Sequence, residues 1–201
     1  TSDGQRFALA DLKDRRFVTG APEACNIARL TGVALPGHVL VGLLLGQPPV
    51  LKRAGGATVR WSDEGRYIVE IPSTRTARQE LAFELHPEDH NRPWSEQRLR
   101  LREVIVHQYG RVAFRAELEG HAAAPMSPPR EDPDRLEPPL PPSGPPCTAE
   151  LPRRLRVEVP DDGQDLLLRY DQIAWNPPLP EGTFTQEPVP GLRPEPVTCT
   201  P

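Results

Sequence analysis

The residues that decide the fold are 111–119, RVAFRAELE, where the apolar Val112, Phe114, Ala116 and Leu118 occupy every second position. Charged side chains fill most of the positions between them. Successive side chains of a β-strand point to opposite faces of its sheet, so this period of two predicts a strand with one apolar and one solvated face.

The same period of two recurs before and after this stretch. The short polar segments Asp63–Gly65 and Tyr109–Gly110 separate neighbouring repeats and are typical of tight hairpin turns. Consecutive strands are therefore expected to lie side by side and antiparallel. The apolar members of the pattern are Val59 and Trp61; Tyr67, Val69 and Ile71; Leu81, Phe83 and Leu85; Leu99 and Leu101; Leu155, Val157 and Val159; and Leu166, Leu168 and Tyr170.

Residues 5–46 predict a hairpin followed by two helices. The hairpin occupies residues 5–18, with a polar turn in its middle. Pro22 suits the first turn of a helix that ends at Gly32, and Pro36 begins a second helix that ends at Gly46. Apolar residues surround the axis of the second helix, so we expect it to be covered on every side.

Together these segments predict a mainly β protein with about nine strands and two short helices. An antiparallel sheet with one apolar face needs cover on that face, and the two helices are the bodies available to supply it. We therefore expect a curved antiparallel sheet, an incomplete half-barrel, with the helices over its concave apolar face. The interior is either filled by side chains or open as a cavity for an apolar ligand.

Proline is concentrated in two places of the single domain that we expect over residues 1–201. The chain has 27 prolines, and they gather in an insertion at 122–149 and in a tail at 186–201. Because proline breaks helices and central strands, both segments are expected to be additions to the sheet. Pro138–Pro142 favours a polyproline II conformation, so the insertion is either a passive loop or a ligand for a partner protein.

The three cysteines, Cys25, Cys147 and Cys199, show neither a CxxC motif nor the spacing of a zinc site. Cys25 falls in the first predicted helix, where we expect a buried thiol. Cys147 and Cys199 lie at the two ends of the last structured block, so we hypothesise a disulfide that ties the insertion to the tail. Such a bond implies an oxidising compartment.

Composition and motifs exclude several classes of protein. A formal net charge of −4 argues against a nucleic-acid binder, which needs a basic surface to neutralise phosphates. The longest apolar run, Val39–Leu45, falls well short of the ~20 residues of a membrane-spanning helix. The chain carries no nucleophile elbow, phosphate loop or metalloprotease motif, so we expect neither enzymatic activity nor a cofactor.

Ligand-type side chains cluster once in the sequence, at His86, Glu88, Asp89 and His90. Two histidines four residues apart share one face of a helix. The neighbouring prolines make this segment a loop instead, so the spacing loses its meaning and no metal site is predicted.

Several motifs resemble a known family when they are taken in order. The matching segments are DGQRFAL (3–9), LLLGQPP (43–49), the turn at Tyr109–Arg111, LPRRLRV (151–157), DLLLRY (165–170) and WNPPL (175–179). In this serial order the chain resembles the LolA/LolB-like superfamily of lipoprotein carriers, particularly outer-membrane lipoproteins of LolB type. The first helix and first strands of that family have no counterpart here, and the insertion is extra.

The resemblance implies a half-barrel with helices across its mouth that carries or receives the acyl chains of lipoproteins without catalysis. It implies the periplasm or the periplasmic face of the outer membrane, with membrane association only through an anchor outside this chain. Carrier and receptor remain open alternatives. A different alternative is a structural protein of the bacterial envelope that binds a partner through its proline-rich loop.

The predicted lipid-binding residues combine this resemblance with the period-two pattern. On the helical lid they are Leu40, Leu43 and Leu44. On the sheet they are Trp61, Val69, Phe83, Leu101, Phe114, Leu118, Val157 and Leu168.

Overall fold

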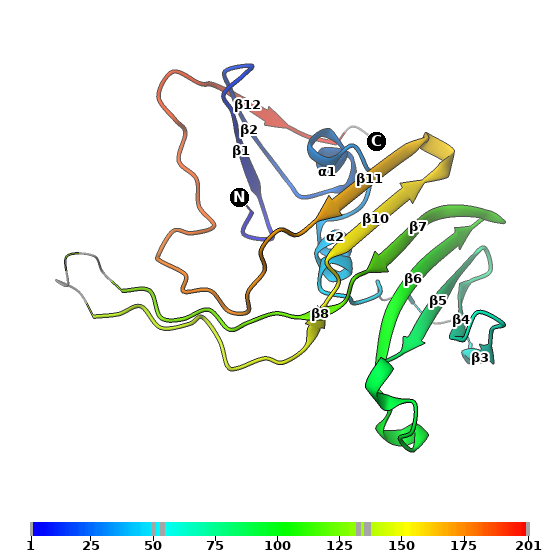
Figure 1. Ribbon diagram of the computed structural model, residues 1–201. Coiled ribbons are helices and arrows are strands. Elements are labelled where there is room, and N and C mark those ends of the chain that lie inside the picture. Colours follow the sequence, from blue (N-terminus) through cyan, green and yellow to red (C-terminus); the bar gives the residue numbers. More distant parts are fainter. Residues whose placement is uncertain (1, 50, 53–54, 132–133, 135–137, 200–201) are drawn as a thin grey trace.

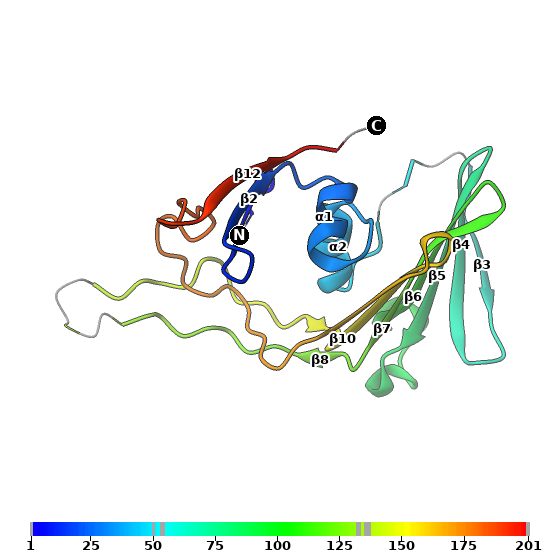
Figure 2. The ribbon, with the colours of Figure 1, turned by 90° about the horizontal axis from the view of Figure 1, so that it is seen from above.

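A computed structural model, which describes residues 2–49, 51–52, 55–131, 134 and 138–199, shows a mainly β protein. The predicted fold class is confirmed: an open, curved antiparallel sheet of seven strands forms the body, and two helices face its concave side (Figures 1 and 2). The strand order is β11-β10-β7-β6-β5-β4-β3. The strands are β3 (Thr58–Trp61), β4 (Arg66–Thr74), β5 (Ala77–Leu85), β6 (Leu99–Gln108), β7 (Arg111–Glu119), β10 (Arg154–Val159) and β11 (Gln164–Arg169).

Turn chemistry explains why successive strands pair. Gly65 between β3 and β4 has φ 76°, and Tyr109 and Gly110 between β6 and β7 have φ 52° and 76°. Two consecutive residues with positive φ suit the right-handed twist of a two-residue hairpin. The register shifts between Ala82 and Phe83, where β5 pairs with β6, and such irregularities bend a sheet.

The helices α1 (Ala24–Thr31) and α2 (Gly37–Leu44) begin and end close to the predicted signals. Gly32 closes α1 in the left-handed conformation with φ 78°, and Pro36 precedes α2. The expectation that α2 is covered on every side is wrong: Leu43 is fully buried, whereas Val41 on the same helix is 55% exposed. Short 3-10 helices occupy Pro87–Asp89, Trp94–Glu96 and Pro160–Asp162.

A second, smaller sheet joins the two ends of the chain (Figure 1). The predicted hairpin forms β1 (Phe7–Asp11) and β2 (Arg16–Gly20), and the proline-rich tail contributes β12 (Arg193–Val197), parallel to β2. Alternate residues of a strand point their N–H groups to opposite edges. The N–H of Arg193 points toward β2, because it donates to the Arg15 carbonyl. The nitrogens of Pro194 and Pro196 therefore point away from β2, where no strand hydrogen bond is lost.

The predicted disulfide between Cys147 and Cys199 is wrong. Cys199, just beyond β12, is bonded to Cys25 at the start of α1, with 5.9 Å between their Cα atoms, and Cys147 is free. The expectation that Cys25 is a buried thiol is therefore also wrong. Both predictions fail because they did not include strand β12. This strand pairs with β2 and so brings Cys199 close to α1, the helix that follows β2.

The insertion extends from the body as a long ribbon (Figures 1 and 2). Its base is closed by the short strands β8 (Ala122–Ala123) and β9 (Glu150–Leu151), and Arg130 and Leu140 exchange backbone hydrogen bonds farther out. Trp175 lies between the two branches. Its backbone bonds to Pro125 and Ser127, and its indole N–H donates to the Ala149 carbonyl at 3.1 Å. The described part of the insertion is thus held against the segment that follows β11.

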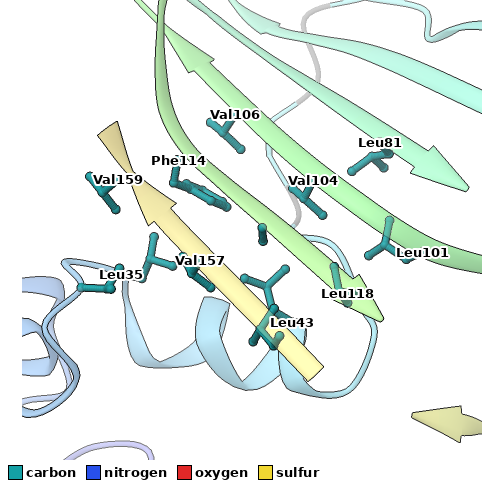
Figure 3. Packing of buried hydrophobic residues seen from close by; sticks show 13 residues of the cluster. Leu35, Leu43, Leu81, Leu101, Val104, Val106, Phe114, Leu118, Val157 and Val159 are labelled. Atoms are coloured by element: carbon teal, nitrogen blue, oxygen red, sulfur yellow. The ribbon is translucent and has the colours of Figure 1, made fainter. Parts of the chain in front are cut away.

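The main core lies between α2 and the middle of the large sheet (Figure 3). Leu43 of α2 is 0% exposed and belongs to one cluster with Leu118 of β7 and Val157 of β10, which are also fully buried. Phe7, Val18 and Val197 form a separate cluster in the small sheet. Apolar burial of this kind is the dominant favourable term in folding.

Candidate functional site

One continuous row of apolar side chains crosses the concave face of the large sheet. The strand register places its members directly opposite one another on all seven strands. Residues directly opposite each other on neighbouring strands point to the same face of the sheet, so these side chains form one continuous apolar row. From β3 to β11 its members are Val59, Val69, Leu81, Val104, Ala116, Val157 and Leu166.

Burial increases from the β3 end of this row toward its middle. Val104, Ala116 and Val157 in the middle are 0% exposed, Val69 is half-buried, and Val59 on the edge strand β3 is 64% exposed. Both helices lie on the β7–β10–β11 side, and β3 lies away from them (Figures 1 and 2). The helical lid therefore covers one half of the concave face, whereas on the other half the apolar side chains of β3 are exposed among the described residues.

A parallel row shows the same change. Trp61 of β3, Tyr67 of β4, Phe83 of β5 and Leu101 of β6 pair in sequence across the sheet. Trp61 is 55% exposed, Tyr67 and Phe83 are half-buried, and Leu101 is 3% exposed. The rings of Trp61 and Tyr67 meet edge to face with centroids 4.7 Å apart, an arrangement that aromatic pairs favour.

The predicted lipid-binding residues divide into three groups. Five are buried in the core cluster beneath α2: Leu43, Leu101, Phe114, Leu118 and Val157. Five are partly buried and pack against that cluster: Leu40, Leu44, Val69, Phe83 and Leu168. Trp61 alone of the predicted set is exposed, on the open half of the face.

Three residues of the open half were missed by the sequence prediction of lipid-binding residues. Val59 lies opposite Val69, Tyr67 lies between Trp61 and Phe83, and Leu99, 47% exposed, lies opposite Leu85. All three carry the same period-two signal as their neighbours, so the pattern could have included them. We call the open half, formed by Val59, Trp61, Tyr67, Val69, Phe83 and Leu99, the apolar trough.

These features define the class: a mainly β, half-open antiparallel sheet protein with an apolar trough on its concave side. No family model, curated protein or solved structure matches the chain. The resemblance to lipoprotein carriers therefore stays a prediction. Within the described residues, neither helix has the length and apolar character needed to cross a membrane.

The convex face of the sheet has the opposite character. Charged residues alternate with the apolar rows and pair across neighbouring strands, as in Arg78–Glu70 at 3.0 Å and Arg102–Glu84 at 3.2 Å. Cross-strand pairs of opposite charge contribute modestly to sheet stability. The predicted division into one apolar and one wet face is thus correct.

The loop between β5 and β6 uses its ligand-type side chains for internal bonds. The Asp89 side chain is fully buried and accepts hydrogen bonds from the backbone and the guanidinium of Arg98, while Arg92 approaches at 3.1 Å. These bonds from Arg98 hold the pKa of Asp89 far below its usual range. His86 and Glu88 also contact the Arg98 guanidinium, at 3.1 and 2.9 Å. Three of the four residues therefore meet at an arginine side chain, and the exposed His90 does not join them.

A small cavity of about 330 Å³ lies between this loop and the base of the insertion. Arg100 donates two hydrogen bonds to Glu150, at 2.6 and 2.8 Å, and thereby lowers the pKa of that carboxyl group. The buried ring of His86 lies 3.4 Å from the same carboxylate. His121 also lines the cavity, and within the described chain neither of its ring nitrogens, both buried, has a hydrogen-bond partner.

Because of His121, we expect the protein to be less stable in mild acid. Burial, and then the charges of Arg102 and Arg100, lower its pKa below 6.5 in the folded protein. The unfolded chain therefore binds the proton first, and the free energy of unfolding falls as pH drops through about 6.5. We expect the melting temperature to decrease between pH 7 and pH 5, as measured by circular dichroism.

A His121→Phe variant should lose less stability over this pH range. Part of the decrease should remain, because burial and Arg78 also lower the pKa of His107. His90→Gln, at an exposed imidazole in the same region, serves as the control. Identical pH profiles for His121→Phe and the parent protein would contradict this account.

Proposed function

We propose that this protein binds the acyl chain of a lipid or lipoprotein in the apolar trough, without catalysis. The observation that supports the proposal is the change in burial along the concave rows. Side chains that a closed core would hide, Val59 and Trp61 above all, are more than half exposed on the inner face of a curved sheet. Exposed apolar surface gathered in a concave place is typical of a binding site.

The energetics suit an acyl chain. Each methylene transferred from water to an apolar surface contributes about 0.8 kcal/mol, so contact along the trough binds a chain without any catalytic group. A flexible chain can also reach from the trough toward the half-buried Leu40 and Leu44 of α2. In this proposal, the predicted lid residues Leu40 and Leu44 form the second wall of the site.

The compartment belongs to the same proposal. The bond between Cys25 and Cys199 supports an oxidising compartment, because disulfides persist in secreted and periplasmic proteins. We therefore propose the periplasm, or the periplasmic face of the outer membrane, as the place of action. Labelling of unreduced protein from its native host with a thiol reagent should modify Cys147 alone.

The direct test uses Trp61 as a reporter. A fatty acid brominated along its chain should quench the Trp61 indole on binding, while the parent fatty acid should not. Trp94 is 85% exposed and lies in the loop between β5 and β6, so Trp94→Phe lowers the background signal. Mass spectrometry of the native complex should show bound fatty acid. Absence of both signals at saturating ligand would refute the proposal.

Val59→Asp should weaken this binding strongly and leave the fold intact. A carboxylate in the trough must lose its water when an acyl chain covers it, and the cost far exceeds the contribution of a few methylenes. We expect affinity for a fluorescent fatty acid to fall at least tenfold. Thr58→Asp is the matched control, since it adds the same charge to the same edge strand on the convex face.

A second candidate function is partner binding through the insertion. It is favoured by the bonds from Trp175 to both branches, which hold the ribbon extended and leave Pro138, Pro139 and Pro141 exposed. A segment that is already ordered loses little entropy when it binds. Deletion of residues 125–145 should then remove a pull-down partner while fatty-acid binding is unchanged, and an unchanged set of partners would exclude this function.

A further inference from the structure

Tyr109 occupies a backbone conformation that its side chain disfavours. Its φ is 52°, in the left-handed region where glycine, asparagine and aspartate are the common residues. A bulky residue there is strained, and it persists only where the surroundings enforce it. The Tyr109 side chain is nevertheless 74% exposed, and no described residue forms a hydrogen bond or ring contact with it. Packing therefore does not explain a tyrosine at this turn.

In the described chain, the other two non-glycine residues with positive φ have side-chain contacts that account for their conformation. Asn176 is of a type that tolerates this conformation, and its side chain donates to the Pro145 carbonyl. Arg15 reaches across to the Gly191 carbonyl beside β12. Tyr109 differs because its exposed side chain has no such partner and the residue lines an open cleft.

That cleft has a volume of about 480 Å³ and lies on the convex side, where the β4–β5 hairpin meets the β6–β7 turn. Arg78 and His107 form its floor. Arg78 is paired with Glu70 at 3.0 Å and lies 3.5 Å from the His107 ring. Arg75, on the hairpin, is exposed and has no ion-pair partner in the described part of the chain.

The charges of the cleft favour an anion. Glu70 neutralises Arg78, so Arg75 leaves an unbalanced positive charge at the rim. Burial, and then the Arg78 charge, lower the pKa of His107, so its imidazole is neutral at pH 7 and can donate or accept one hydrogen bond. Thr74 and Thr76 add hydroxyl groups to the wall. A flat ring can stack on Tyr109 while an oxyanion meets the guanidinium groups.

We propose that this cleft binds a small oxyanion that carries a flat ring, with Tyr109 stacking on the ring and Arg75 holding the phosphate or carboxylate. An arginine fork suits either group, since both present two oxygens in one plane. The site is independent of the apolar trough because it lies on the other face of the sheet. The strain at Tyr109 is the cost of placing an aromatic ring at the rim.

Phenyl phosphate is the probe that combines both features. In a titration followed by amide NMR, it should shift the signals of Thr76, Tyr109 and Gly110 and saturate. Inorganic phosphate, which lacks the ring, should bind at least tenfold more weakly. Benzoate distinguishes the two oxyanions: tighter binding of benzoate would assign a carboxylate ligand, and tighter binding of phenyl phosphate would assign a phosphate ester.

Tyr109→Asn separates stability from binding. Asparagine relieves the strain at this turn, so the melting temperature should rise by about 3 °C, while affinity for phenyl phosphate falls about tenfold with the loss of stacking. Arg75→Gln should also cost about tenfold through its lost charge. Arg111→Gln is the control, because Arg111 carries the same charge two residues from Tyr109 but does not line the cleft.

The proposal is overturned if phenyl phosphate causes no saturable shift at the three amides, or if Tyr109→Asn binds as tightly as the parent protein. It is also overturned if Arg75→Gln and Arg111→Gln weaken binding equally, since only general charge attraction would then act.

Discussion

Replacing Cys199 with serine is expected to lower the free energy of unfolding by about 4 kcal/mol. The bond to Cys25 spans 174 residues, and cross-linking so long a loop removes much of the entropy of the unfolded chain. It also holds β12, an edge strand with two prolines, against β2. Urea denaturation of the variant and of the parent protein measures the difference.

Hydrogen exchange locates the effect of this replacement. The backbone amides of β2 and β12 should exchange much faster in Cys199→Ser, while those of β6 and β7 should change less. Cys147→Ser is the matched control, because Cys147 is free and its replacement removes no bond. If Cys147→Ser destabilises the protein as much as Cys199→Ser does, the pairing of Cys25 with Cys199 is not the one present in solution.

Replacing Leu43 with alanine is expected to cost about 3 kcal/mol. Leu43 is 0% exposed and joins α2 to the middle strands of the large sheet, so the shorter side chain leaves a cavity in the main core. The cost combines the lost burial of the leucine with the cavity that remains. Thermal and urea unfolding should both show the loss.

Val41→Ala provides the comparison on the same helix. Val41 is 55% exposed, so its truncation should change stability by no more than about 0.5 kcal/mol. Both substitutions introduce alanine into α2, so differences in helix propensity are small beside the effect of burial. Equal effects of the two variants would show that α2 does not pack on the sheet through Leu43.

The strands of the large sheet were predictable because their signal is local. Phe114 and Leu118 alternate with charged residues, and Tyr109–Gly110 closes a hairpin, whatever the rest of the chain does. The helix boundaries at Gly32 and Pro36 were predictable for the same reason. The candidate trough was only half predictable, since alternation assigns Trp61 and Leu101 to one face but says nothing of how far a lid extends.

Prolines concealed β12, a strand that the sequence analysis missed. Pro194 and Pro196 argue against a central strand, and only the presence of β2 beside this segment shows that they lie on its outer edge. Once that strand is missed, the partner of Cys199 is missed too. The error in the disulfide and the error in the tail therefore have one cause.

By itself, the sequence determined the mainly β class, the pairing of neighbouring strands and the division into an apolar and a charged face. Each depends on side chains within a few residues of one another. Only the tertiary structure decided that β12 lies on β2, that Cys25 meets Cys199, and that α2 fills the middle of the concave face while the trough beside β3 stays open. The reason is that these features depend on contacts between residues far apart in the chain, which no local pattern encodes.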